Sequence, residues 1–309
     1  MNSEVEGKVA DSLDNPSKTK KLIALGEVIV VRFVVYALVA LGLLQLVYGS
    51  LDPSPFPLGA SYLIGTLWFA IPALMIYGFR REPGKYGLSI SRGPQSVDLA
   101  LNAFPFYALT NVGFVILIFM NWPYLEPLGA LVLTGFFTLA LWLIVRMVSQ
   151  KYDHFEDVQI SRRKHRNNVL SILFLLLLPV ILGLAMMRLS WALVSTVVWQ
   201  FIFSGFGEEI FFRGYIQSRL NAAFGRPYEW KGIRFGAGLF ITAAIFATTH
   251  VLNTANIWLG NFNMAWWWGT FTFVGGILFG LLREKTQSVV APGVLHGLEA
   301  VGEGLGLLF

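Results

Sequence analysis

The sequence predicts an all-α fold, a polytopic transmembrane helix bundle of about eight or nine spans. Of its 309 residues, 55% are hydrophobic and only 13% are charged, whereas a soluble domain carries roughly 25% charged residues. The charges also gather in short connections between long apolar runs, and each run is near the ~20 residues that a helix needs to cross a bilayer. Composition and pattern together exclude a water-soluble core of this size.

The apolar runs define the expected helices in order along the chain. The first run contains Glu27 and Arg32, so we expect its first turns to lie in the membrane interface. The absence of cysteine excludes disulfides, thiolate catalysis and cysteine-ligated metal. The nine runs cover 22–48, 58–78, 98–120, 127–148, 169–188, 191–222, 234–252, 264–282 and 287–309.

Positive charge alternates between the two ends of these runs. Lys and Arg precede the first span and follow spans two, four, six and eight, whereas the connections 49–57, 121–126 and 253–263 contain neither. Cytoplasmic loops carry such an excess of Lys and Arg. We therefore expect residues 1–21 to form a short cytoplasmic tail, and we attribute the net charge of +5 to loops rather than to nucleic-acid binding.

Ionisable side chains are concentrated in the last four spans, and the first five contain far fewer. Such groups cost roughly 2.5–3.5 kcal/mol each inside the hydrocarbon, so they mark functional sites. This contrast predicts N-terminal transmembrane helices over 22–190 and a catalytic or binding core over 191–309. The ionisable residues singled out inside these last four spans are Glu208, Glu209, Arg213, His250, His296, Glu299 and Glu303.

The two adjacent glutamates differ in the partners available to them. Glu209 and Arg213 are four residues apart, which places them on one helix face in the favourable order for an ion pair. Glu208 points about 100° away on a helix of 3.6 residues per turn and needs another partner. A buried carboxylate beside a histidine is suited to act as a general base toward water.

The candidate residues also agree in depth. If the sixth helix continues to Leu220, Glu208 lies ~18 Å from its inner end at 1.5 Å per residue. His250 lies ~24 Å past Arg234, and His296 lies ~17 Å past Lys285 on the same scale. These levels agree within about one turn, so a shared site within the membrane is allowed.

At these residues the chain resembles the type II CAAX prenyl protease and bacteriocin-processing family of intramembrane glutamic endopeptidases. Glu208, Glu209 and Arg213 match its E-E-x-x-x-R motif, and the run 246–250 matches F-x-x-x-H. His296 opens the third motif, H-x-x-x-N/D. The resemblance covers about 190–309.

The resemblance implies a role for each matched residue. Glu208 and His250 would activate water for attack on a peptide carbonyl, and His296 would help to bind the oxyanion. Glu209 and Arg213 would support helix packing. No cofactor and no metal are implied.

The third motif departs from the family at its last position, where Ala300 replaces Asn or Asp. Half of the expected oxyanion hole is therefore missing. Asn253 follows His250 by three residues on the same helix face and is a candidate donor in its place. Glu299 is a poorer substitute, since a carboxylate repels an oxyanion unless it is protonated.

We therefore predict an intramembrane endopeptidase that cleaves membrane-associated proteins or peptides, including prenylated CAAX-type tails, with membrane lipid as its other partner. The N-terminal half is typical of a bacterial member, which favours the bacterial plasma membrane. The enzymatic alternatives are a zinc site formed by Glu208, His250 and His296 and a serine nucleophile at Ser204, which lacks an elbow signature. A transporter or an inactive scaffold is the non-enzymatic alternative, although no symmetric second half is present.

Overall fold

The structure is a computed structural model that describes residues 17–52, 55 and 57–309. Most of the predicted tail, 1–21, lies outside the described residues, and its last residues begin the first helix. The N-terminal half contains α2 (Lys18–Ile29), η1 (Val30–Val35), α3 (Tyr36–Tyr48), α4 (Pro57–Gly65), α5 (Leu67–Ala73), η2 (Leu74–Gly78), η3 (Pro83–Tyr86), α6 (Gly93–Tyr107), α7 (Leu109–Met120), α8 (Pro127–Lys151), η4 (Phe155–Asp157) and α9 (Arg162–Ala185).

The C-terminal half continues the bundle. It contains α10 (Trp191–Val198), η5 (Trp199–Glu208), η6 (Ile210–Gln217), α11 (Ser218–Phe224), β1 (Tyr228–Trp230), β2 (Ile233–Phe235), α12 (Ala237–Leu252), η7 (Ile257–Leu259), α13 (Trp268–Thr286), α14 (Val290–Gly297) and α15 (Glu299–Gly306). The predicted all-α bundle is thus confirmed.

Five helices in the described part of the chain are long and apolar enough to cross a membrane: Lys18–Tyr48, Leu58–Gly78, Gly93–Met120, Pro127–Lys151 and Arg162–Ala185. They coincide with the first five predicted spans. In the C-terminal half, the helical backbone runs from Trp191 to Phe224 through four successive segments, so the sixth helix continues past the glutamate pair as expected. The count of eight or nine spans stays a prediction.

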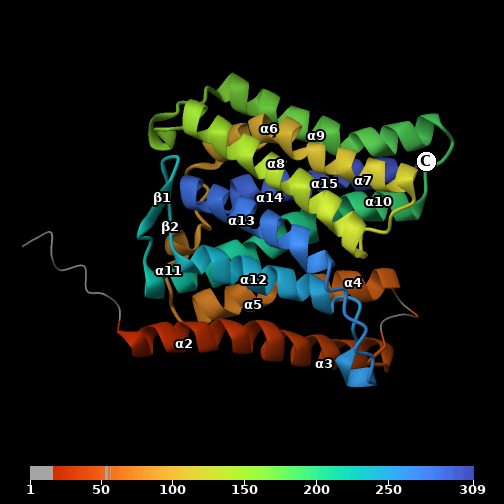
Figure 1. Cartoon of the computed structure of the whole chain (residues 1–309), viewed down its shortest axis with the longest axis horizontal. Helices are drawn as coiled ribbons and strands as arrows, with labels where there is room; N and C mark the ends of the chain where they lie inside the picture. The colour runs from red at the N-terminus through yellow and green to blue at the C-terminus, as the bar shows by residue number, and fades with distance from the viewer. Residues whose placement is uncertain (1–16, 53–54, 56) are drawn as a thin grey trace, which may run out of the picture.

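The bundle is arranged around its C-terminal helices. In Figure 1 the long helix α2–α3 runs along one side and α9 along the other, with α12, α13 and α14 between them. Packing joins α12 to α13, α14 to both η5 and α6, and α8 to α13. The N-terminal helices therefore enclose the core that carries the ionisable residues.

Two clusters of buried apolar side chains hold this arrangement. The first joins α6, α8 and α9 to α13 and α14, and it includes Leu133, Phe279 and Ala300. The second joins the N-terminal helices to η6 and α12, and it includes Trp68 and Phe211.

A carboxylate anchors the first helix to the rest of the bundle. Glu27 accepts hydrogen bonds from Arg81 at 2.7 Å, from Arg219 at 2.8 Å and from the Tyr215 hydroxyl at 2.8 Å. The sequence predicted an interfacial position for the first turns of this helix. In the structure Glu27 is largely enclosed by its partners.

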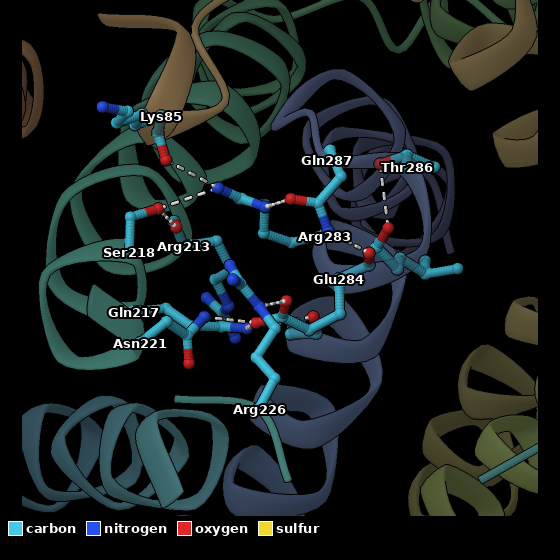
Figure 2. A network of polar contacts seen from close by, with 12 residues as sticks. Lys85, Arg213, Gln217, Ser218, Asn221, Arg226, Arg283, Glu284, Thr286 and Gln287 are labelled. Carbon is cyan, nitrogen blue, oxygen red and sulfur yellow. Dashed lines mark hydrogen bonds and ion pairs between the residues drawn. The ribbon is translucent and has the colours of Figure 1, made fainter. Parts of the chain in front are cut away.

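A second polar network joins η6 and α11 to the end of α13 (Figure 2). The buried carboxylate of Glu284 accepts hydrogen bonds from Gln217 at 2.6 Å, Asn221 at 2.5 Å and Arg226 at 2.5 Å. Charge-assisted hydrogen bonds of this kind are about twice as strong as neutral ones. They fix the spacing of the helices that carry the glutamate pair and the Gly276 carbonyl.

The neighbouring Arg283 side chain completes this network. It donates to the Ser218 hydroxyl at 2.9 Å and to the Lys85 carbonyl at 3.2 Å, so it ties α11, α13 and η3 together (Figure 2).

A short antiparallel hairpin, β1–β2, stands between α11 and α12, with Trp230 paired to Ile233. Lys231 and Gly232 form its two-residue loop, with φ of 54° and 71°. Positive φ at both positions is the geometry of a type I′ turn, which matches the twist of hairpin strands. The sequence analysis did not predict this hairpin.

Candidate active site

The glutamate pair lies where two π-helical segments meet. η5 ends at Glu208 and η6 begins at Ile210, so Glu209 stands at the junction. π-helical turns are rare, and they occur frequently at functional sites because the wider turn redirects side chains. The two carboxylates therefore lie on a backbone that differs from the regular helix expected from the sequence.

Glu209 is fully buried and has two charged or polar partners. Its Oε1 accepts a hydrogen bond from Arg213 Nη1 at 2.8 Å, which confirms the predicted ion pair. The same oxygen lies 2.9 Å from His296 Nδ1. Glu209 thus orients a histidine as well as pairing with Arg213, and the sequence analysis missed this second contact.

Arg213 is held from several sides. Its Nη2 donates to the Gly276 carbonyl at 3.3 Å, and its guanidinium lies 4.3 Å from the centre of the Phe246 ring. Because Phe246 precedes His250 by one turn of α12, Arg213 connects the glutamate helix to the helix of the second motif. This supports the packing role that the sequence predicted for Arg213.

Two glycines allow α14 to approach η5 closely enough for the Glu209–His296 contact. A Cβ on Gly205 would lie 2.5 Å from the Gly297 Cα atom, and a Cβ on Gly297 would lie 2.7 Å from the Phe201 ring. Backbone therefore packs directly on backbone beside the site. Any side chain at Gly205 would force the two helices apart.

His296 is buried, and both of its ring nitrogens have polar neighbours. Its Nδ1 faces Glu209, while its Nε2 lies 3.4 Å from the Ser204 hydroxyl and 3.9 Å from Glu299 Oε2. The ring stacks on Phe279 with a centroid distance of 4.6 Å. These contacts fix the orientation of the imidazole and direct Nε2 toward Ser204.

His250 lies near the end of α12, where its Nδ1 is 2.9 Å from the Phe246 carbonyl. A carbonyl oxygen only accepts hydrogen bonds, so Nδ1 carries the proton and Nε2 is left with a free lone pair in the neutral ring. The ring also packs edge-on against Phe246 and Trp268. His250 is thus oriented as a proton or water acceptor.

Glu208 has an unsatisfied buried oxygen. Within the described part of the chain, its Oε2 atom has no hydrogen-bond partner. No direct hydrogen bond joins Glu208 to His250 among the described residues, but Arg32 and Arg213 interact electrostatically with both side chains. A buried carboxylate oxygen without a protein donor is a position for water or substrate.

The comparison with protein families covers the segment that carries these residues. Residues 190–301 match the type II CAAX prenyl endopeptidase Rce1-like family. The match contains all five motif residues, Glu208, Glu209, Arg213, His250 and His296, and it confirms the resemblance predicted from the sequence. At the level of the family it supports a membrane endopeptidase, and with the apolar helices it makes the chain a multi-pass membrane protein. No match was found among curated proteins or among solved structures.

The Rce1-like segment does not bring every predicted residue to the site. Asn253, the candidate oxyanion donor, lies exposed just after the end of α12; its backbone N–H donates to the His250 carbonyl at 3.2 Å, and its side chain has no hydrogen bond to the other candidates in the described structure. Ala300 is fully buried in the apolar cluster around α14. Neither position supplies a donor next to His296, whereas the Ser204 hydroxyl is near it.

Three residues at the site were not predicted in these roles. Arg32 donates from Nε to the Thr249 hydroxyl at 3.1 Å, next to His250. Tyr107, from α6, donates to Glu299. Ser204 was considered only as a nucleophile. Arg32 had a recognisable signal, a charge within an apolar run, whereas nothing in the sequence near Tyr107 indicated its contact.

The described residues contain no group of three or more His, Asp or Glu side chains arranged to hold a metal ion. Among the described residues, the three considered as zinc ligands do not form such a group.

Proposed function

We propose that the protein is an intramembrane endopeptidase that hydrolyses peptide bonds of membrane-associated substrates with a water activated by Glu208 and His250. The observation that carries the proposal is the buried Glu208 oxygen without a protein donor among the described residues; the oriented His250 ring, whose neutral form leaves Nε2 unprotonated, supplies the second group. The family match to 190–301 supports the class of reaction.

The proposed reaction uses one water. Glu208 takes a proton from this water while His250 Nε2 accepts its second hydrogen bond, which positions the oxygen. The water oxygen bonds to the peptide carbonyl carbon and forms a tetrahedral intermediate with a negative oxygen. The C–N bond then breaks as the proton held by Glu208 passes to the leaving amine, and the products are a carboxylic acid and a free amine.

We further propose that His296, with both ring nitrogens protonated, donates from Nε2 to the negative oxygen and that the Ser204 hydroxyl donates to it as well. Glu209 fixes the His296 ring through Nδ1, so that Nε2 faces Ser204 at 3.4 Å. Two donors that lie side by side in advance are the usual requirement of an oxyanion hole. Ser204 would then be the second oxyanion donor in place of the Asn or Asp that Ala300 replaces, and Asn253 becomes the weaker candidate.

The proposed division of the chain follows from these roles. Residues 191–309 form the catalytic core, residues 22–190 form the enclosing helices, and residues 1–21 form a cytoplasmic tail. The alternation of positive loops supports an N-terminus on the cytoplasmic side of a bacterial plasma membrane. The description of the matched family makes prenylated CAAX tails the first substrates to test.

The test is cleavage by the purified protein in detergent or lipid nanodiscs. A fluorogenic, prenylated C-terminal peptide and a general peptide library are incubated with wild type, Glu208→Gln, His250→Ala and the surface control Glu229→Gln. We expect cleavage by the wild type and the control, and a fall of at least ~10²-fold in both site variants.

Cleavage that is unchanged in Glu208→Gln and His250→Ala would refute the assignment of these residues. Absence of cleavage of every peptide by the wild type would favour the scaffold or transporter alternative.

A further inference from the structure

Arg32 is a buried arginine without a carboxylate partner, and unlike Arg283, whose terminal nitrogens donate to Gln287, Lys85 and Ser218, it uses neither terminal nitrogen in the described structure. It is 9% exposed, and within the part of the chain that the structure describes its one hydrogen bond runs from Nε to Thr249. Arg213, by contrast, is paired with Glu209, and Arg226 with Glu284. The two terminal nitrogens of Arg32 therefore have no acceptor among the described side chains.

The surroundings of Arg32 stabilise its charge but leave its donors unused. Three aromatic rings face the guanidinium, with centroids 5.5 Å away for Phe33, 4.7 Å for Tyr36 and 5.4 Å for Trp68. Ring faces attract a cation, but they do not replace the paired N–H···O bonds that a guanidinium forms in its plane. A carboxylate matches that planar arrangement of donors with two parallel hydrogen bonds.

Arg32 is placed beside the proposed catalytic residues. Its partner Thr249 is the residue before His250, and its charge interacts with those of Glu208 and His250. Among the described residues, no ion pair joins Arg32 to Glu208. The terminal nitrogens of Arg32 are therefore free to bind another acceptor.

We propose that Arg32 binds a carboxylate of the substrate, namely the C-terminal α-carboxylate of a membrane-associated peptide. The proposal rests on the proposed endopeptidase function and adds the group of the substrate that the enzyme recognises. A carboxylate held beside Thr249 would place the scissile bond within a few residues of the peptide's end, because each extended residue spans ~3.3–3.6 Å. Enzymes of this kind would cleave near free C-termini rather than in the middle of a chain.

A carboxylate has two sources, the chain terminus or an acidic side chain, and the test separates them. Three labelled peptides share one sequence and one lipid group: the first ends in a free acid, the second in a C-terminal amide, and the third in an amide with an aspartate as its last residue. Binding is measured by fluorescence anisotropy, and cleavage by product release. The proteins are wild type, Arg32→Gln, Arg32→Lys and Arg146→Gln, an exposed arginine on α8 that lies over Trp142.

We expect the wild type and Arg146→Gln to bind the free acid at least about tenfold more tightly than the plain amide, the size of one lost charge-assisted hydrogen bond. Arg32→Gln should remove this preference by weakening the binding of the free acid alone, with the affinity for the amide unchanged. Arg32→Lys should keep part of it, since a point charge remains.

Equal binding of acid and amide by the wild type would overturn the proposal, as would an Arg32→Gln variant that weakens both peptides alike. The second result would make Arg32 a counter-charge for Glu208 only. A preference for the aspartate amide equal to that for the free acid would contradict the C-terminal source. Because binding is measured without turnover, these results are separate from a failure of the proposed proteolysis, which appears as no cleavage of any peptide.

Discussion

The contact between Gly205 and Gly297 makes a quantitative prediction about the site. In Gly205→Ala the new methyl would stand 2.5 Å from the Gly297 Cα and 2.7 Å from the Gly297 nitrogen, whereas ordinary contacts begin at 3.4 Å. Both obstructing atoms belong to the backbone of α14, so they cannot rotate away. The helices must separate by about 0.9 Å at this point.

That separation acts directly on the histidine of the third motif. If it is passed on to the Glu209–His296 contact, the 2.9 Å distance grows to nearly 3.8 Å, beyond the ~3.2 Å limit of a good N–H···O bond. Overpacking costs about 1–3 kcal/mol, and a 1 Å misplacement near a catalytic group costs about 10²-fold in rate. We therefore expect Gly205→Ala to fold with lower stability and to cleave its substrate about 100-fold more slowly.

The assay compares Gly205→Ala with Gly42→Ala, whose added methyl meets nothing within 4 Å. Both changes raise helix propensity equally, so a difference between them reports the packing alone. Thermal unfolding in detergent and kcat on the fluorogenic peptide are measured for each. Cleavage by Gly205→Ala within threefold of Gly42→Ala, with equal thermal stability, would refute the reasoning.

Three further predictions concern other parts of the structure. Glu209→Ala leaves Arg213 buried without its ion pair and should lower the free energy of unfolding by about 3–5 kcal/mol, measured by denaturant titration; a loss under 1 kcal/mol would contradict the buried pair. Glu284→Ala should lower the free energy of unfolding by about 1.5–3 kcal/mol, because charge-assisted hydrogen bonds are lost. The control Glu229→Ala, in an exposed 3.5 Å pair, should lower it by at most ~1 kcal/mol. Equal losses in the two variants would argue against the network in Figure 2. Exhaustive chelation should leave peptide cleavage unchanged, and loss of cleavage restored by Zn²⁺ would revive the metal alternative.

Much of the fold followed from the sequence because hydrophobic length is a strong signal in a bilayer. The first five predicted spans coincide with long helices, and the sixth runs past the glutamate pair as the apolar pattern required. The hairpin 228–235 was missed because its strands are three residues long, too short for an alternating pattern.

The site was predictable where local spacing decides a contact. The i,i+4 spacing of Glu209 and Arg213 predicted their ion pair correctly. The contact of Glu209 with His296 joins residues 87 positions apart, and it depends on the close approach of Gly205 to Gly297, which no local pattern encodes.

The exposed position of Asn253 has a similar cause. The spacing argument placed it on the face of His250, but Asn253 is the C-cap of α12, where its backbone N–H bonds to the His250 carbonyl and the residue is exposed. Arg32 was assigned to the interface because it lies near the start of an apolar run. Tertiary packing buries it instead, since Trp68 and Tyr36 cover its guanidinium.

The first helix carries both Glu27, which anchors it, and Arg32, which reaches the site, yet it lies outside the segment 190–301 that matches the family. On the roles proposed above, the part of the chain that selects a peptide and the part that cleaves it would be encoded separately. Two proteins with the same 190–301 segment and different first helices would share one chemistry and process different sets of targets. Diversification within such a group would then be sought in the N-terminal helices, and an exchange of the first helix between two such proteins would transfer substrate choice.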